Sequence, residues 1–189
     1  MEIKERVISG VFEISLSPNY DERGFFTRTF DHKIFSEMKI VHNWVQENHS
    51  YTLKSGTIRG LHFQFPPFSE TKLIRVLHGK IIDVIVDLRK DSKTFGKWDS
   101  IELSRENNKV LLVPRGLAHG FCTLVDNCDV LYKVDNIYSP EYENGLKWND
   151  KDLQIKWPTK DPIVSSKDNN LLNFKDFVAK YGGINISKS

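Results

Sequence analysis

The middle of the chain is a succession of short apolar segments separated by turn residues. From Leu73 to Leu77 and from Ile81 to Leu88, apolar residues alternate with polar ones or run together, as β-strands do. The intervening His78-Gly79-Lys80 predicts a hairpin. Further strands are predicted at Val7 to Leu16, Val41 to Ser50, Thr57 to Phe63, Trp98 to Leu103, Val110 to Val113, Gly120 to Leu124 and Val130 to Tyr138. We therefore expect an all-β sandwich or barrel rather than a parallel α/β sheet.

A few short helices are expected at the margins. Asp31 is a favourable N-cap for a helix running through Phe35 to Met38. Near the C-terminus, apolar residues recur at helical spacing, and Gly182-Gly183 follows as a stop signal. These residues are Leu171, Phe174, Val178 and Tyr181. Their apolar stripe is expected to pack on the barrel.

Composition narrows the class of protein. The chain has 189 residues, 39% hydrophobic and 28% charged, without a composition shift, so residues 1–189 are expected to form a single domain. A net charge of +2 does not favour nucleic acid or an anionic membrane as partner. The N-terminus lacks the apolar core of a signal peptide, and no apolar run is long enough to span a bilayer. We expect a cytoplasmic protein.

Two cysteines, Cys122 and Cys128, lie in apolar-flanked segments. Their spacing matches neither common zinc sites nor a disulfide-rich secreted scaffold. We expect two reduced, partly buried thiols.

The densest cluster of polar residues with catalytic potential surrounds His62. On a strand, alternation places Gly60, His62 and Gln64 on one face, which would point into a barrel. A lone histidine is more often structural than catalytic, but a second one, His119, follows the turn at Pro114-Arg115-Gly116.

These two segments resemble the two signature strands of the cupin superfamily, whose fold is a jelly roll. Many cupins bind a metal through a His-x-His pair and an acid in the first segment and one histidine in the second. Here Gln64 interrupts the pair, and Glu70 could complete only a weak site with His62 and His119. We expect no metal.

From about Asp21 to Asp168 the chain resembles, more closely, the dTDP-4-dehydrorhamnose 3,5-epimerase family. The order and spacing of many short motifs carry this resemblance. They are Asp21 to Phe26, Val45 to Ser50, Arg59 to Gln64, Lys72-Leu73, Asp83 to Arg89, Ser92 to Gly96, Pro114 to Phe121, Leu131 to Lys133, Trp148 to Asp150 and Ile155 to Pro158.

The resemblance implies epimerisation at carbons 3 and 5, beside the C4 ketone of a nucleotide-linked 4-keto-6-deoxy sugar, without a cofactor. It implies that His62 is the base, oriented by Asp168, that Tyr132 is the acid, and that Lys72 stabilises the enolate. Taken without the family, Tyr132 reads as a core tyrosine, Lys72 as an edge-strand lysine and Asp168 as a helix cap.

The resemblance also implies substrate contacts. The matching residues are Arg23, Gln46, Asn48, Arg59, His119, Tyr138 and Glu143. Arg28 stands where the family usually has a glutamate near the nucleobase, and we include it as a candidate contact. Glu70 replaces a usual glutamine beside Lys72 and is expected to moderate the field of that lysine.

The nearest alternatives are an epimerase of a single carbon and an epimerase of a CDP- or GDP-linked keto-sugar. A metal-dependent cupin and a non-catalytic sugar-nucleotide binding module are alternatives from other classes. The family resemblance implies a homodimer, and we expect the Val7 to Leu16 strand to pair across its two-fold axis.

Overall fold

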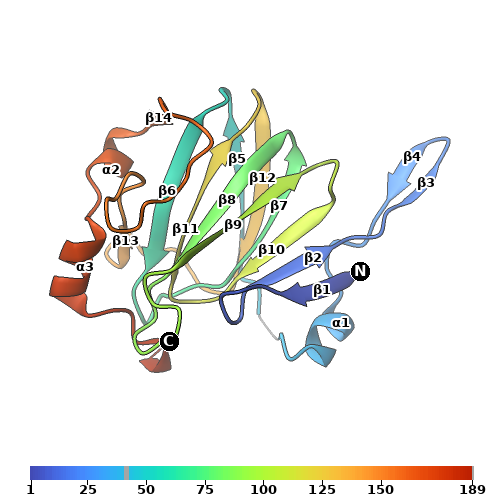
Figure 1. Ribbon diagram of the computed structural model, residues 1–189. Helices are drawn as coiled ribbons and strands as arrows, with labels where there is room; N and C mark the ends of the chain where they lie inside the picture. The colour runs from blue at the N-terminus through green and yellow to red at the C-terminus, as the bar shows by residue number, and fades with distance from the viewer. Residues whose placement is uncertain (41–42, 189) are drawn as a thin grey trace.

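Two antiparallel sheets lie face to face in the computed structural model, which describes residues 1–40 and 43–188 (Figure 1). The first sheet has the order β1 (Glu2–Glu5), β2 (Phe12–Ser15), β10 (Lys109–Val113), β7 (Lys72–His78), β12 (Cys128–Val134) and β5 (Gln46–Thr52). The second has the order β13 (Glu143–Gly145), β6 (Thr57–Gln64), β11 (Leu117–Thr123), β8 (Lys80–Asp87) and β9 (Trp98–Ser104). The short strand β14 (Ile163–Val164) runs parallel to β6. This architecture confirms the expected β-rich jelly roll.

Apolar side chains are buried in three clusters, one between the sheets and one on the outer face of each. The cluster between the sheets includes Ile74, Ile85 and Leu111. On the outer face of the second sheet, Phe63 and Phe177 meet under the C-terminal helix. On the outer face of the first, Val110, Leu112 and the α1 residue Phe35 pack together. Both sheets are therefore covered outside as well as inside, which explains strands that are apolar on both faces.

The two helices expected from the sequence are present. α1 (His32–Glu37) is capped by Asp31, whose Oδ1 accepts hydrogen bonds from the backbone N–H groups of Lys33 and Ile34. α3 (Phe174–Tyr181) begins later than the apolar stripe indicated, and Gly182 ends it in the left-handed conformation. A one-turn helix, α2 (Ser166–Asn169), and a 3-10 turn at Ile186–Lys188 were not predicted.

The predicted hairpin between residues 73 and 88 is wrong. Both strands exist, but β7 pairs with β10 and β12 in the first sheet, whereas β8 pairs with β11 and β9 in the second. The link at Gly79 therefore crosses from one sheet to the other. Gly79 lies against Cys128 at a positive φ of 81°, and an added Cβ would lie 2.6 Å from the Cys128 sulfur.

Several predicted strand ends also need correction. Residues 7–10 form a turn between β1 and β2, where Gly10 has a φ of 81°, so the Val7 to Leu16 strand is reduced to Phe12–Ser15. This strand pairs with β1 on one edge and with β10 on the other, so the expectation that it pairs across a two-fold axis is wrong. The strand expected from Val41 begins at Gln46, and positions 41 and 42 lie outside the described residues. β11 begins at Leu117 rather than Gly120, and β12 spans Cys128–Val134, ending before Tyr138.

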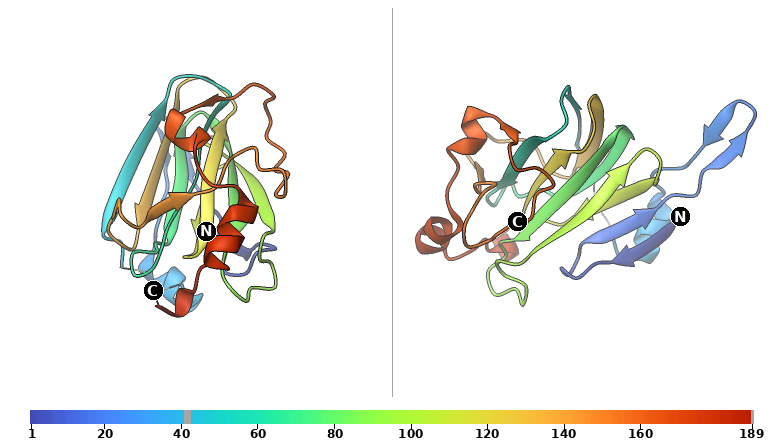
Figure 2. Two further views of the ribbon diagram at one scale, coloured as in Figure 1. Left: turned by 90° about the vertical axis from the view of Figure 1, so that its left-hand side faces the viewer. Right: turned by 45° about the horizontal axis from the view of Figure 1, so that its top comes forward.

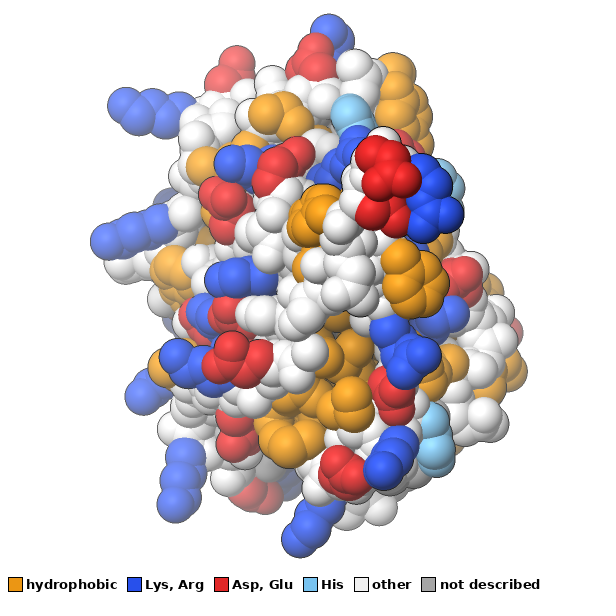
Figure 3. Space-filling view, turned by 90° about the vertical axis from the view of Figure 1, so that its right-hand side faces the viewer, with side chains coloured by type: hydrophobic (Ala, Val, Ile, Leu, Met, Phe, Trp, Pro, Cys, Tyr) orange, Lys and Arg blue, Asp and Glu red, His pale blue; other side chains and the backbone are white. Residues whose placement is uncertain are grey.

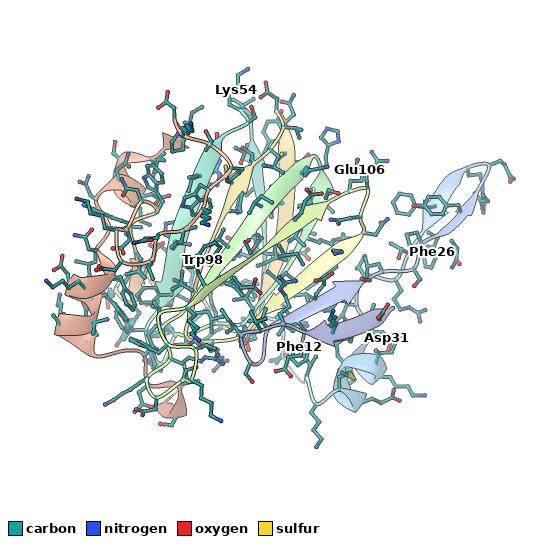
Figure 4. The ribbon with its side chains drawn as sticks, in the orientation of Figure 1. Phe12, Phe26, Asp31, Lys54, Trp98 and Glu106 are labelled. Atoms are coloured by element: carbon teal, nitrogen blue, oxygen red, sulfur yellow. The ribbon has the colours of Figure 1, made fainter. Side chains whose placement is uncertain are left out.

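A further hairpin was not expected. β3 (Asn19–Asp21) and β4 (Gly24–Phe26) pair only with each other and project away from the two sheets (Figures 1 and 2). Its aromatic side chains Tyr20 and Phe26 are 70% and 69% exposed (Figure 4 labels Phe26). An apolar projection of this kind is a feature of surfaces that meet a partner.

Cys122 and Cys128 are both buried free thiols, as expected, and burial raises the pKa of Cys122 to about 11. In the described part of the chain, no helix is both long enough and apolar enough to cross a membrane.

Candidate active site

A cavity of about 540 Å³ opens between the two sheets. One wall comes from β6 and β11, the facing wall from β5, β7 and β12, and the segment from β14 to α2 closes a third side. Polar and charged side chains converge on it, as is typical of binding sites. The polar lining residues are Ser50, Thr57, Arg59, His62, Lys72, His119, Tyr132, Ser165, Lys167 and Asp168. The structure therefore brings together the candidate base, acid, enolate stabiliser and orienting carboxylate.

His62 and Asp168 form a hydrogen-bonded pair in this cavity. His62 Nε2 lies 2.7 Å from Asp168 Oδ1, while Asp168 Oδ2 accepts a hydrogen bond from the backbone N–H of Gly60 at 3.1 Å. Ser165 caps α2 by accepting the backbone N–H of Asp168 at 3.0 Å, which fixes the carboxylate under β6. Asp168 is 4% exposed.

The protonation state of Asp168 follows from these contacts. Burial by itself would raise the pKa of this carboxyl, but the hydrogen bonds from His62 and Gly60 outweigh it and leave the pKa below its usual value. An ionised carboxylate can only accept, so Nε2 of His62 carries the proton. In the neutral ring Nδ1 then has the free lone pair, which is the state required of a base.

Lys72 and Tyr132 lie on the facing sheet. Lys72 Nζ is 5.7 Å from the centre of the Tyr132 ring and forms an ion pair with Glu70. Burial, followed by the nearby charges of Glu70 and Glu143, raises the pKa of Tyr132, so its hydroxyl stays protonated at neutral pH. A base on one wall and a proton-bearing phenol with a cation on the other are thus placed around one cavity.

The strand carrying His62 departs from simple alternation. His62 is opposite His119, but Arg59 is opposite Phe121, so β6 has one extra residue over this stretch. The bulge lets Arg59 border the cavity together with His62, while Leu61 and Phe63 enter the outer cluster under α3. Gln64 is buried and reaches Glu70 rather than the cavity.

His119 is paired with a second carboxylate. Its Nε2 lies 2.8 Å from Asp83 Oδ2, and Asp83 is completely buried. Burial raises the pKa of Asp83, although the charges of His119 and Lys72 oppose this. Within residues 1–40 and 43–188, no three His, Cys, Asp or Glu side chains are grouped as metal ligands, and Glu70 is engaged by Lys72. The expectation that no metal or cofactor is needed stays a prediction.

Other candidate contacts gather at the cavity mouth. Glu143 Oε2 accepts hydrogen bonds from the Tyr138 hydroxyl and from Lys167 Nζ, each at 2.7 Å. The backbone N–H of Tyr138 donates to Gln46 Oε1 at 2.8 Å. Gln46 and Asn48 share a face of β5 with Ser50, which lines the cavity, and Asn48 is opposite Tyr132 in the register.

Arg23 and Arg28 are not brought to the cavity of their own chain. Arg23 is on the projecting hairpin, where it pairs with Asp21. Arg28 pairs with Asp31 at 3.1 Å and so supports the cap of α1. Figure 3 looks onto the face that carries the hairpin, where hydrophobic side chains gather in patches between charges of both signs.

Several residues of the site were not singled out by the sequence analysis, namely Ser50, Thr57, Ser165, Lys167 and Asp83. Lys167 lines the cavity, and its position next to Asp168 could have suggested it. Asp83 orients His119, and a lone aspartate within the apolar stretch of β8 was the available signal.

Comparison with known proteins shows which family the chain resembles. A family model described as dTDP-4-dehydrorhamnose 3,5-epimerase matches residues 5–176. The chain belongs to this family. A family member from Shigella flexneri, named dTDP-4-dehydrorhamnose 3,5-epimerase, is 46% identical over 159 residues, which cover 82% of this chain and 86% of the relative.

Solved structures of family members share the fold. The Bacillus anthracis dTDP-4-dehydrorhamnose 3,5-epimerase, with TDP and PPi bound, is 47% identical with a TM-score of 0.89, covering 92% of this chain and 99% of that one. The Legionella pneumophila dTDP-6-deoxy-D-glucose-3,5-epimerase, in complex with dTDP-4-keto-L-rhamnose, is 36% identical with a TM-score of 0.89, covering 95% of each chain. The family recognition and the fold class are therefore both confirmed.

Proposed function

We propose that this protein is an isomerase that converts dTDP-4-dehydro-6-deoxy-D-glucose to dTDP-4-dehydro-L-rhamnose by epimerisation at C3 and C5. The observation that carries the proposal is the His62–Asp168 pair facing Lys72 and Tyr132 across one cavity. The C4 ketone acidifies the hydrogens on both neighbouring carbons, so a base, an acid and a cation suffice for the chemistry.

Each inversion proceeds through an enolate. Nδ1 of His62 removes the proton from the carbon, which leaves an imidazolium stabilised by the Asp168 carboxylate and an enolate stabilised by Lys72. The Tyr132 hydroxyl then donates its proton to the same carbon. Since His62 and Tyr132 belong to opposite walls, the proton leaves one side of the sugar and returns on the other. The imidazolium releases a proton to solvent and the tyrosinate gains one, so no proton is consumed overall.

The rest of the cavity suits a nucleoside diphosphate sugar. Arg59 and His119 border it and would contact the diphosphate and the sugar. Tyr138, 54% exposed at the mouth, offers a ring on which a base can stack, and Glu143 and Gln46 hold that segment. The nucleotide assignment is supported by the ligands named for the relatives from B. anthracis and L. pneumophila.

We also propose that the protein acts as a homodimer in which the β3–β4 hairpin of one subunit completes the site of the other. The hairpin projects from its own sheets and exposes Tyr20 and Phe26, so it is shaped to meet another chain. Arg23 can contact substrate only if its hairpin reaches the cavity of the other subunit, and Arg28 follows Arg23 on the same segment. We further propose that residues 1–189 form a single domain and that the protein is cytoplasmic.

Solvent exchange tests the chemistry. Incubation with the dTDP-linked substrate in D₂O should introduce deuterium at both C3 and C5, measured by proton NMR, and the CDP- and GDP-linked analogues should react more slowly. His62→Ala should abolish exchange at both carbons, whereas Tyr132→Phe should retain some exchange and lose inversion. His49→Ala is a matched control, because His49 forms a similar 2.7 Å pair with Asp129 but is exposed.

Other outcomes point to the alternatives. Exchange at one carbon alone would indicate a single-carbon epimerase, and full activity of His62→Ala would refute the base assignment. Loss of a stoichiometric metal together with activity on chelation would indicate a metal-dependent cupin. Binding without exchange would indicate a non-catalytic module.

Subunit mixing tests the dimer. Arg23→Ala and His62→Ala are each impaired alone, but a mixed dimer has one site that combines an intact Arg23 with an intact His62. Activity should therefore reappear on mixing. A mixture of His62→Ala with Tyr132→Phe, whose residues share one cavity, should not regain epimerisation. If the first mixture also stays inactive, or the chain sediments as a monomer, the exchange is wrong.

A further inference from the structure

The cation of the proposed enolate site is already paired with a carboxylate. Lys72 Nζ forms an ion pair with Glu70 Oε1, and both side chains are 11% exposed. Such a pair is shielded from solvent, so the negative charge of Glu70 strongly reduces the attraction of Lys72 for a negatively charged ligand. Within the described chain, Lys72 lines the cavity, whereas Glu70 lies behind it and is absent from the lining.

Glu70 is held from behind by a buried amide. Its Oε2 accepts a hydrogen bond from Gln64 Nε2 at 3.1 Å. The orientation of Gln64 is determined independently, because Nε2 is also within hydrogen-bonding distance of the carbonyls of Phe68 and Ile137, at 2.9 and 3.2 Å, so its two hydrogens are shared among three acceptors. Its Oε1 accepts the backbone N–H of Ser139 at 2.6 Å. The Glu70 carboxylate is therefore a fixed point from which Lys72 extends.

This arrangement creates a competition. An enolate oxygen that approaches Lys72 must share the ammonium with Glu70, and the two negative groups repel each other. At the same time, the ion pair with Glu70 keeps the ammonium at the end of the flexible lysine stem beside Tyr132. One carboxylate thus has two opposing effects, on the position of the cation and on its effective charge.

We propose that Glu70 is a positioning residue of the C4-oxygen site, which holds the Lys72 ammonium beside Tyr132 and attenuates the positive charge that reaches the enolate. This inference rests on the proposed function, since it assumes that Lys72 meets the C4 oxygen. It goes beyond that function by describing how a carboxylate outside the cavity lining tunes the cation and the acid.

The Glu70 carboxylate also affects the pKa of Tyr132, the proposed acid. After burial, the charge of Glu70 is the largest cause of the raised pKa of Tyr132, followed by that of Glu143, while Arg59 opposes them. Glu70 therefore also contributes to the raised pKa of the phenol. The titratable groups around Tyr132 on the cavity side are Glu70 before β7, Lys72 on β7, Arg59 and His62 on β6, His119 on β11, Glu143 on β13, and Lys167 and Asp168 on α2. A second, smaller pocket that also borders Tyr132 is lined by Glu47 on β5, Arg75 on β7 and Lys133 on β12.

Two substitutions separate position from charge. Glu70→Gln removes the negative charge, and its single amide oxygen can still accept from Lys72 while the hydrogen bond from Gln64 is lost. The exchange rate at saturating substrate should therefore rise about threefold or more, with KM changed by less than about twofold. Glu70→Ala removes the anchor as well, and the rate should fall about tenfold. An unchanged or lower rate in Glu70→Gln overturns the charge effect, and an unchanged rate in Glu70→Ala overturns the positioning.

A measurement without substrate makes the test independent of the proposed function. The tyrosine Cζ resonances are followed by NMR against pH, and the Tyr132 signal is the one absent in Tyr132→Phe. In Glu70→Gln its midpoint should move to lower pH by about half a pH unit or more, because one of the charges that raise its pKa is gone.

Glu47→Gln is the matched control. Glu47 is on the outward face of β5, where it pairs with Lys133 at 2.7 Å, so the Tyr132 midpoint should not move. An equal midpoint in Glu70→Gln and wild type overturns the inference. If the wild-type protein fails to epimerise any keto-sugar while the midpoint does move, the proposed function fails but the electrostatic link to Tyr132 stands.

Discussion

Asp168→Asn is the substitution that most directly tests how His62 is activated. The carboxylate accepts two hydrogen bonds, from His62 Nε2 at 2.7 Å and from the Gly60 N–H at 3.1 Å. An asparagine side chain has one oxygen, so one of these donors must lose its acceptor. If the amide nitrogen faces His62, the ring must carry its proton on Nδ1, and the base is lost.

The size of the effect follows from the charge. An imidazolium and a carboxylate about 4 Å apart attract by about 4 kcal/mol at an effective dielectric constant of about 20. His62 is 32% exposed, so solvent screens part of this attraction. The attraction that remains after screening stabilises the transition state by roughly 3 kcal/mol, so losing it should lower the rate about a hundredfold. The wrong tautomer of His62 would lower the rate further.

The assay is deuterium exchange at C3 and C5 under saturating substrate, with thermal unfolding measured alongside. Asp99→Asn is the matched control, because Asp99 also accepts from a cation, Arg6 at 2.7 Å, but does not line the cavity. We expect the control to keep its rate. The reasoning would be refuted if Asp168→Asn stayed within about fivefold of wild type, or lost no more than Asp99→Asn does.

Two further outcomes are expected. Because the pKa of Asp168 is lowered in the folded state, this carboxylate stabilises the fold above its unfolded pKa of about 3.8 and loses that contribution as pH falls through the lower folded value. Urea unfolding between about pH 6 and pH 2 should show the stability difference between wild type and Asp168→Asn shrinking; a constant difference would contradict this. Gly60→Ala should lower the unfolding temperature by several degrees in calorimetry, because its Cβ would lie 2.7 Å from Gly120 Cα and His119 O at a φ of 114°; Gly24→Ala, with open space around it, should lower it less.

The sequence was sufficient for the features that depend on local residue type. Most of the strands in the middle of the chain lie where apolar residues alternate or run together. Asp31 caps α1, as its side chain indicated. The order and spacing of the motifs from Asp21 to Asp168 were sufficient to recognise the family. Two of their residues, His62 and His119, lie opposite each other on adjacent strands. The residues proposed as base, acid, cation and orienting carboxylate all border one cavity.

The tertiary structure decided which strands meet. Nothing in the local pattern distinguishes a tight link that returns a strand to its neighbour from one that crosses to the opposite sheet, so the β7–β8 hairpin was predicted wrongly. The bulge that turns Arg59 toward the cavity depends on the β11 register, and the separation of Arg23 from its own cavity depends on the hairpin's projection.

The sequence by itself therefore determined most of the longer strands, the cap of α1, the family and the chemical types present in the site. Only the tertiary structure showed that Glu70 is bound to Lys72 and anchored by Gln64, and that Asp83 is buried behind His119. The physical reason is that propensity and periodicity act within a few residues, whereas charge pairing and strand register join side chains far apart in the chain, through burial that no single segment encodes.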